Sequence, residues 1–428
     1  MTTTQMLHDA TNQSSTAVLD ASETRRAYTI FQQIGAGGCG SVWAWHDVHE
    51  VIKCQDAAAS SITGRSLRNE YDMHLRVLKS LEKVMAAGVL DDAPNRIVVP
   101  GCYWYKDADD RWSGGQELLG REGGKALGNC DILCSERIRP LPQRIRGGLV
   151  GAFCPEEVGE RVMESVGDQD CLVKVYLGQR SRDDSHERGE FTCRDFPIYL
   201  DLMEELGLDV HGYASVMADV LAMMHWSARV DAAGVEFVLG MHSVSDEAAA
   251  SSWQCHPTED SSASSGRQIS TEKLHHVAEL GALLRGEDIA MHLLDFDQVA
   301  TIPMTPQGVD LAVEAFFLNG AYYPRPSHKG LEREVWTTFR ERYLHTSLRI
   351  VEADHEAHTN LLAWLGPLGG KPADLLACGF DERLGLPEMF VRKVEEGLYE
   401  REARRGLVGF GATLSEHAGG VKEVLDAV

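Results

Sequence analysis

The pattern of hydrophobic and polar residues divides the chain into stretches of different period. Within residues 28–54, short apolar runs that include Trp43 and Ile52 are separated by glycine-rich or polar turns, which predicts three consecutive strands. From Ser66 onward the period changes. Apolar residues recur every three or four positions as far as Met85, which predicts an amphipathic helix.

Beyond this helix the pattern predicts short strands first and helices later. The predicted strands occupy 97–100, 102–105 and 132–134. The predicted helices occupy 213–224, 309–317, 331–344 and 388–404. The polar stretch 107–128 is expected to be an exposed loop, and the pattern between 139 and 212 is less informative.

This order of elements predicts an α+β protein with a small antiparallel β lobe, a larger helical lobe and a helical C-terminal extension. Residues 1–26 are rich in Ser, Thr, Ala and Asp and are expected to be a disordered tail. The Ser-, Ala- and His-rich stretch at its centre makes 241–287 an expected flexible insertion in the larger lobe. The expected small lobe is 27–138, the larger lobe 139–345 and the extension 346–428.

Composition and charge limit the partners and the compartment. With 41 Lys and Arg against 65 Asp and Glu, the net charge of −24 repels nucleic acid and anionic membrane, so neither is expected as a partner. No apolar run is long enough to span a bilayer, and the polar start is unlike a signal peptide. We expect a cytoplasmic, or at least intracellular, protein, with the nucleus open. Ten cysteines lack zinc spacing, since Cys130 and Cys134 have no matching Cys or His pair.

A glycine-rich motif near the N-terminus offers the first candidate chemistry. Gly35, Gly37 and Gly40 precede Val42, and Lys53 follows within a short apolar run, which is typical of a protein-kinase nucleotide loop. Glycines let backbone N–H groups approach phosphates, and the lysine supplies a fixed positive charge. A glycine-rich hairpin without a ligand is the alternative. The predicted nucleotide-binding residues are Gly35, Gly37, Gly40, Val42, Lys53 and, between the lobes, Glu136.

Four acidic residues follow in the order that phosphoryl transfer from ATP requires. Glu70 lies about seventeen residues after Lys53 in the predicted helix and is expected to orient that lysine, although a surface glutamate is the alternative. Asp231 stands where the catalytic loop of a kinase has its base, and Glu236, five residues later, stands where that loop has a metal-binding asparagine. Asp295 precedes Phe296 after an apolar run, the context of a metal-binding aspartate.

Several residues depart from the kinase pattern. Ala233 replaces the catalytic-loop lysine, Glu236 replaces a neutral amide, and Asp297 replaces a glycine. Glu236 and Asp297 would join Asp231 and Asp295, so that four carboxylates gather around one site. These carboxylates would repel ATP unless Mg²⁺ or Mn²⁺ is present. We therefore predict catalytic roles for Asp231, Lys53 and Glu70, metal binding by Asp295 and Glu236, and ATP with Mg²⁺ (or Mn²⁺) as cofactors.

With these motifs the chain resembles a group of uncharacterised fungal proteins, sometimes labelled zinc-finger-like. The resemblance rests on the segments 235–240, 293–297, 315–319 and 322–326 and is strongest from about 215 to 345. It implies a fungal source and a protein-kinase-like bilobal fold, but no activity.

Two functions remain open from the sequence. The first is an ATP- and metal-dependent phosphotransferase acting on a small molecule or a protein. The second is a pseudokinase or scaffold that binds nucleotide or a protein partner without catalysis, which the departures at Ala233, Glu236 and Asp297 favour. An unrelated fold is the third alternative.

Overall fold

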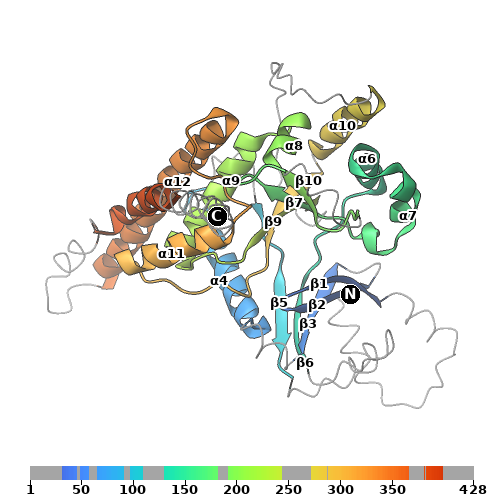
Figure 1. Ribbon diagram of the computed structural model, residues 1–428. Helices are drawn as coiled ribbons and strands as arrows, with labels where there is room; N and C mark the ends of the chain where they lie inside the picture. Colours follow the sequence, from blue (N-terminus) through green and yellow to red (C-terminus); the bar gives the residue numbers. More distant parts are fainter. Residues whose placement is uncertain are drawn as a thin grey trace, which may run out of the picture.

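The computed structural model describes residues 31–45, 49–56, 65–90, 97–108, 130–181, 191–242, 271–286, 288–365, 380 and 382–398. The described chain contains two five-stranded sheets and a larger set of helices (Figure 1), which confirms the expected α+β class. The expected disordered tail, most of the expected loop at 107–128 and the centre of the expected insertion lie outside the described residues.

The first sheet is antiparallel throughout, as the sequence predicts. Its strands lie in the order β1-β2-β3-β6-β5. They are β1 (Phe31–Gly37), β2 (Gly40–Trp45), β3 (Glu50–Asp56), β5 (Cys102–Lys106) and β6 (Cys130–Glu136). The glycines thus lie at the hairpin that joins β1 to β2.

Alternation along the strands gives this sheet two apolar faces. One face buries a cluster that includes Trp43, Ile52 and Ile132. The other face buries Leu133 against Leu67, the first residue of helix α4 (Leu67–Ala86). The predicted amphipathic helix is therefore confirmed, and it covers the face of the sheet to which Lys53 belongs.

The second sheet is mixed and lies in the larger lobe, where the sequence led us to expect mainly helices. Its order is β4-β10-β9-β7-β8, with parallel pairing of β4 with β10 and of β7 with β8. The strands are β4 (Ile97–Val98), β7 (Val173–Tyr176), β8 (Phe196–Tyr199), β9 (Glu236–Met241) and β10 (Ile289–Leu294).

Two expectations are corrected by this sheet. Strands β7 and β8 were missed because four residues are too few to establish an alternating pattern. Strand β4 belongs to the expected small lobe by position, yet it pairs with Met291 and His292 of the second sheet. Long-range pairing, which no local pattern encodes, decides both points.

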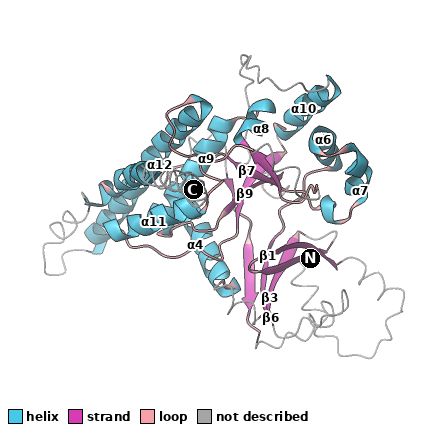
Figure 2. Ribbon diagram, viewed as in Figure 1, coloured by secondary structure: helices cyan, strands magenta, loops and turns pink. Residues whose placement is uncertain are grey.

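The helices surround the second sheet (Figure 2). Along the chain between β6 and β10 come α6 (Gln143–Phe153), η1 (Glu156–Val158), α7 (Gly159–Glu164), η2 (Gly167–Gln169), α8 (Leu200–Glu205), α9 (Val210–Ala222), the π-helical η3 (Met223–Ala228) and α10 (Thr271–Leu284). After the last strand follow α11 (Pro306–Leu318), α12 (Gly330–Leu365) and a helical segment at 386–398.

These helices confirm the predictions at 213–224 and 309–317 and change two boundaries. Helix α10 occupies the end of the expected flexible insertion. Helix α12 runs continuously through the expected boundary between lobe and extension at 345. Arg342 Nε lies 2.7 Å from Asp219 Oδ1 of α9 and ties α12 to the lobe. Among the described helices, none is both long and apolar enough to cross a membrane.

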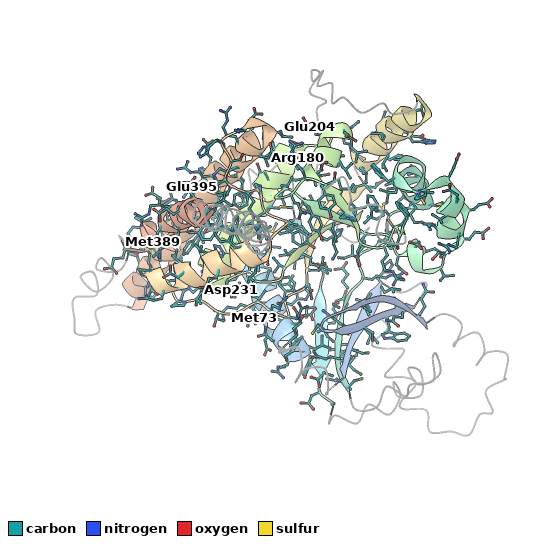
Figure 3. All side chains as sticks on the ribbon, in the orientation of Figure 1. Met73, Arg180, Glu204, Asp231, Met389 and Glu395 are labelled. Carbon is teal, nitrogen blue, oxygen red and sulfur yellow. The ribbon has the colours of Figure 1, made fainter. Side chains whose placement is uncertain are left out.

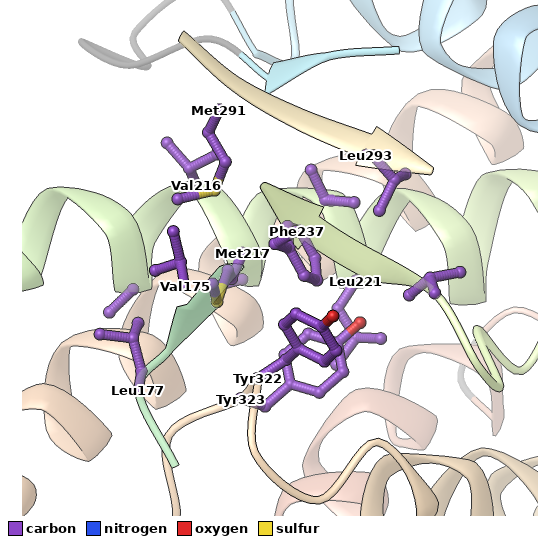
Figure 4. Close-up of a cluster of buried hydrophobic side chains, with 14 of the residues drawn as sticks. Val175, Leu177, Val216, Met217, Leu221, Phe237, Met291, Leu293, Tyr322 and Tyr323 are labelled. Atoms are coloured by element: carbon purple, nitrogen blue, oxygen red, sulfur yellow. The ribbon is translucent and has the colours of Figure 1, made fainter. Parts of the chain in front are cut away.

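The main core lies between the second sheet and helix α9 (Figure 4). Phe237 of β9 and Leu293 of β10 are fully buried and point toward Met217 and Leu221 of α9. Tyr323, in the loop after α11, completes this cluster. Tyr322 and Tyr323 are both buried, and both rings contact Phe237. One face of the second sheet therefore packs against α9, and the opposite face is the one that can contribute side chains to a site.

The hairpin glycines give a direct test of the fold. Gly40 has a φ of +141°, and a Cβ there would lie 2.0 Å from the Cys54 carbonyl oxygen, whereas a Cβ at Gly37 meets nothing within 4 Å. We expect Gly40→Ala to lower the free energy of unfolding by roughly 2 kcal/mol or more. Gly37→Ala should change it by less than about 0.5 kcal/mol. Urea unfolding of both variants measures the difference, and equal effects would contradict the hairpin geometry.

Candidate functional site

A cavity of about 270 Å³ lies between the two sheets. The glycine hairpin, the α4 helix and the ends of β6, β7, β9 and β10 contribute to its wall. All six predicted nucleotide-binding residues line it, together with Glu70, Glu236 and Asp295. The structure therefore brings together residues that are up to about 260 positions apart in the sequence, with Asp231 as the exception among the predicted site residues.

Lys53 lies at the centre of an ion-pair network in this cavity. Its Nζ is 2.7 Å from Glu70 Oε2 and 2.9 Å from Asp295 Oδ1. Strand β3 carries the lysine, α4 the glutamate and the residue after β10 the aspartate. The predicted contact between Lys53 and Glu70 is present, and Asp295 extends it to the second lobe.

Burial and charge act against each other in this network. Burial alone would lower the pKa of Lys53, but the attraction of Glu70 and Asp295 outweighs it, and the pKa is raised. Burial raises the pKa of Glu70 to about 7, against the opposing effect of the Lys53 ammonium. Lys53 is therefore a permanent cation, while the pKa of Glu70 is raised above its usual value.

Helix α4 is fixed by contacts on either side of Glu70. Asn69 donates hydrogen bonds to the carbonyl oxygens of Asp297 (3.1 Å) and Val299 (2.9 Å) in the second lobe. His74 Nε2 lies 2.7 Å from the Pro100 carbonyl oxygen, and its ring stacks on Phe296 at 4.6 Å between centroids. The carboxylate of Glu70 is thus positioned by a helix that contacts both lobes.

Glu236 has a partner that the sequence analysis missed. Lys174 Nζ of β7 lies 2.8 Å from Glu236 Oε1, and both side chains are partly buried in the cavity wall. The strand 173–176 alternates buried and half-buried residues, so Lys174 faces the cavity while its neighbours face the core. A lone lysine within an apolar run was the available signal, and the run was too short to be recognised.

Asp231 lies outside the cavity wall. It belongs to the loop between η3 and β9 and is labelled in Figure 3. Its Oδ1 accepts hydrogen bonds from the backbone N–H groups of Ala233 (3.1 Å) and Ala300 (2.9 Å). Burial raises its pKa, although these hydrogen bonds oppose the rise. The described contacts of this carboxylate hold the loop, and its catalytic role stays a prediction.

Three of the four carboxylates that we expected at one site, Glu236, Asp295 and Asp297, lie near one another, because the charge of Asp295 adds to burial in raising the pKa of the other two. Asp231 lies apart from them, outside the cavity wall. Asp295 pairs with Lys53, Glu236 with Lys174, and Asp231 with backbone N–H groups. The fully buried carboxylate of Asp297 lies 3.3 Å from Arg65 Nη1. Mutual repulsion is relieved because each anion has its own donor from a different segment, a pairing that the linear sequence cannot show.

The segment between the lobes is also held by polar contacts. Glu136 Oε2 accepts a hydrogen bond from the Gly101 backbone N–H at 2.8 Å, which ties β6 to the start of β5. Arg137, next in the chain, pairs with Asp170 at 2.5 Å, and both line the cavity. The carboxylate of Glu136 is thus engaged by the protein itself, while the residue still borders the cavity.

The comparisons with known proteins give one partial match. A protein-family model described as a zinc finger protein matches residues 291–355. No curated protein and no solved structure matches the chain. The expected membership of a fungal kinase-like family is therefore wrong, since the matching family model carries a zinc-finger description and gives no support for a kinase family.

The residues of the matched segment do not fit a zinc finger. The segment contains no cysteine, and its histidines are His292, His328, His345 and His355. His292 is buried in β10, while His355 stacks on Phe380. Within the described ranges, the side chains close enough to share a metal ion are His275, His276 and Glu279 of α10, which lie outside the matched segment. We derive no zinc-dependent step.

Buried histidines predict how the stability depends on pH. Burial lowers the pKa of His74 to about 4, of His225 to about 3 and of His292 to about 4, from a usual value of 6.5. Between pH 6.5 and 4 these histidines are protonated in the unfolded chain but stay largely neutral in the folded chain. The free energy of unfolding should therefore fall with falling pH, by roughly 1 kcal/mol per pH unit for each histidine.

His74→Gln removes one titrating group and keeps a side-chain N–H for the Pro100 carbonyl oxygen. Urea unfolding between pH 7 and 4 should then show a shallower slope, by about 1 kcal/mol per pH unit. The exposed His345 provides the matched substitution, His345→Gln. An unchanged slope in His74→Gln would mean that this ring is protonated in the folded protein.

Proposed function

We propose that this chain is a nucleotide-binding protein with a protein-kinase-like bilobal arrangement, in which ATP occupies the cavity between the two sheets. The observation that carries the proposal is the ion-pair network of Lys53 with Glu70 and Asp295 beside the glycine hairpin. A kinase-type site uses a strand lysine in contact with a helix glutamate, together with a metal-binding aspartate.

The remaining cavity wall suits the other parts of a nucleotide. Ile34, Val42, Leu133 and Leu172 supply apolar surface against which a base can pack. Nothing lies within 4 Å of a Cβ built at Gly37, so a phosphate has room to approach the hairpin backbone. The apolar wall and the hairpin belong to the same cavity as Lys53, which fits a ligand with a flat base and an anionic tail.

Asp295 and Glu236 are the oxygen donors that would hold Mg²⁺ or Mn²⁺. A divalent ion there would neutralise phosphate charge next to Lys53. Both carboxylates already contact lysines, so the ion would compete with Lys53 for Asp295 and with Lys174 for Glu236. We therefore expect metal to bind together with the phosphates, which add further oxygen ligands.

The second candidate function is phosphoryl transfer to a small molecule or a protein, with Asp231 as the base. The observation that favours it is the backbone around Asp231. Arg229 and Ala232 have φ values of 57° and 61°, a region that side-chain-bearing residues rarely adopt. Such strain is often retained at functional sites. This loop leads directly into Glu236 at the cavity wall.

Nucleotide binding by the full chain tests the first proposal. We expect ATP to raise the melting temperature, more strongly with Mg²⁺, because a ligand that binds the folded state stabilises it. Gly37→Val, which fills the space at the hairpin, and Lys53→Met should each weaken ATP binding at least tenfold in equilibrium dialysis. Lys83→Met, which removes an exposed lysine of α4 paired with Asp354, is the matched control.

If the unmodified chain does not bind ATP, the proposal that the cavity is a nucleotide site is wrong. Equal losses in Lys83→Met and Lys53→Met would show that any lost lysine weakens binding, so that the cavity is not the site.

Asp231→Asn separates binding from catalysis. The amide keeps an oxygen that can accept from Ala233 and Ala300, so the fold and ATP affinity should stay within about twofold of the unmodified chain. If Asp231 is the base, transfer of the terminal phosphate should fall by roughly 10²- to 10⁴-fold. Measuring ³²P release or transfer from labelled ATP gives the answer, and unchanged turnover in Asp231→Asn would exclude Asp231 as the base.

A further inference from the structure

The charge around Lys53 is too small for a phosphorylated ligand. Lys53 carries one positive charge and contacts Asp295 and Glu70. One ammonium and two carboxyl groups carry no net positive charge, whether or not Glu70 is protonated. A ligand with several phosphate groups needs further positive charge in the same cavity.

Other cations along the wall are held by the protein. Arg137 contacts Asp170, and Arg194 donates to the Gly167 carbonyl oxygen at 3.0 and 3.2 Å. Arg65 lies against the fully buried carboxylate of Asp297. These contacts fix the guanidinium groups in the cavity wall or behind it.

Lys174 differs from these in its position. It lies on a strand of the second sheet, faces the cavity and contacts Glu236 at 2.8 Å. Strand pairing brings the two side chains together, since Lys174 is opposite Val238, two residues from Glu236 on the same face. Tyr176, two residues from Lys174 on the same face of β7, packs edge-on against Tyr322 at 4.8 Å between ring centroids.

We propose that Lys174 is a second anion-binding lysine of the cavity and that Glu236 acts as its counterion. Together with Lys53, Lys174 would select ligands that carry a chain of phosphate groups over those with one or none. The inference rests on the proposed nucleotide site and assigns it a ligand class, nucleoside di- and triphosphates. The loop between η3 and β9 contains Ala233 and no lysine, and β7, which carries Lys174, is the strand next to β9.

The contact with Glu236 fixes Lys174 at the cavity wall, since its ammonium lies 2.8 Å from that carboxylate. An ammonium has three N–H donors, so it can donate to a phosphate oxygen in the cavity while it stays beside Glu236.

The test compares ligands that differ in phosphate number, using isothermal titration calorimetry with adenosine, AMP, ADP, ATP and inorganic tripolyphosphate. Lys174→Met leaves Glu236 without its partner, so the double variant Lys174→Met/Glu236→Gln is included, which removes both charges together. All titrations are made without divalent metal, because Glu236 is also a proposed metal ligand. Lys174→Arg keeps the charge. Lys83→Met is again the control at an exposed lysine.

We expect the double variant to bind ATP and tripolyphosphate at least tenfold more weakly, with adenosine and AMP affinities within twofold. Lys174→Arg should restore most of the lost affinity. Equal loss for all ligands, or no loss for ATP, would overturn the assignment of Lys174.

Tripolyphosphate and adenosine separate this inference from the proposed function. Adenosine binding without any gain from added phosphates would leave the nucleotide site in place and remove Lys174 from it. Tripolyphosphate binding that depends on Lys174, without adenosine binding, would keep the anion site and reject the nucleotide. Binding of neither would overturn both.

Discussion

The ion pairs of Lys53 join the three segments on which the cavity depends. A strand of the first sheet carries the ammonium, helix α4 carries Glu70, and the end of β10 carries Asp295. The paired side chains are mostly buried, so forming the pairs requires removing water from three charged groups. Loss of one partner would strongly destabilise the folded protein, because a buried charge would be left without compensation. This network therefore joins the two lobes electrostatically, and a group that contacts Lys53 lies next to both of them.

Pairing with separate cations is how the protein tolerates its acidic cavity. A chain with a net charge of −24 places Glu70, Glu236, Asp295 and Asp297 within a small region. Lys53, Lys174 and Arg65 come from three different elements, and each meets one or two of these anions. This arrangement offsets most of the negative charge of the carboxylates, which lowers the electrostatic repulsion that an anion near the lysines would meet.

The comparisons and the geometry point in different directions, and the geometry carries more information here. The zinc-finger description applies to residues 291–355, which contain no cysteine. That segment does contain Asp295 and Asp297, the ends of two ion pairs that reach β3 and the start of α4. The same segment also accepts hydrogen bonds from Asn69 of α4 and stacks Phe296 on His74, so it joins the two lobes.

Local pattern alone determined a good part of this protein. The three strands around the glycine hairpin and helices α4, α9 and α11 follow from periodicity, because neighbouring residues specify them. The contact of Lys53 with Glu70 was predicted from the order of kinase motifs, and the structure contains it. Tertiary structure decided the rest. Strands β4, β7 and β8 exist through partners far along the chain, so Lys174 could not be assigned to the cavity from its short strand. Nor could spacing show that Asp231 binds the backbone N–H of Ala300, since only the folded chain brings those two segments within hydrogen-bond reach.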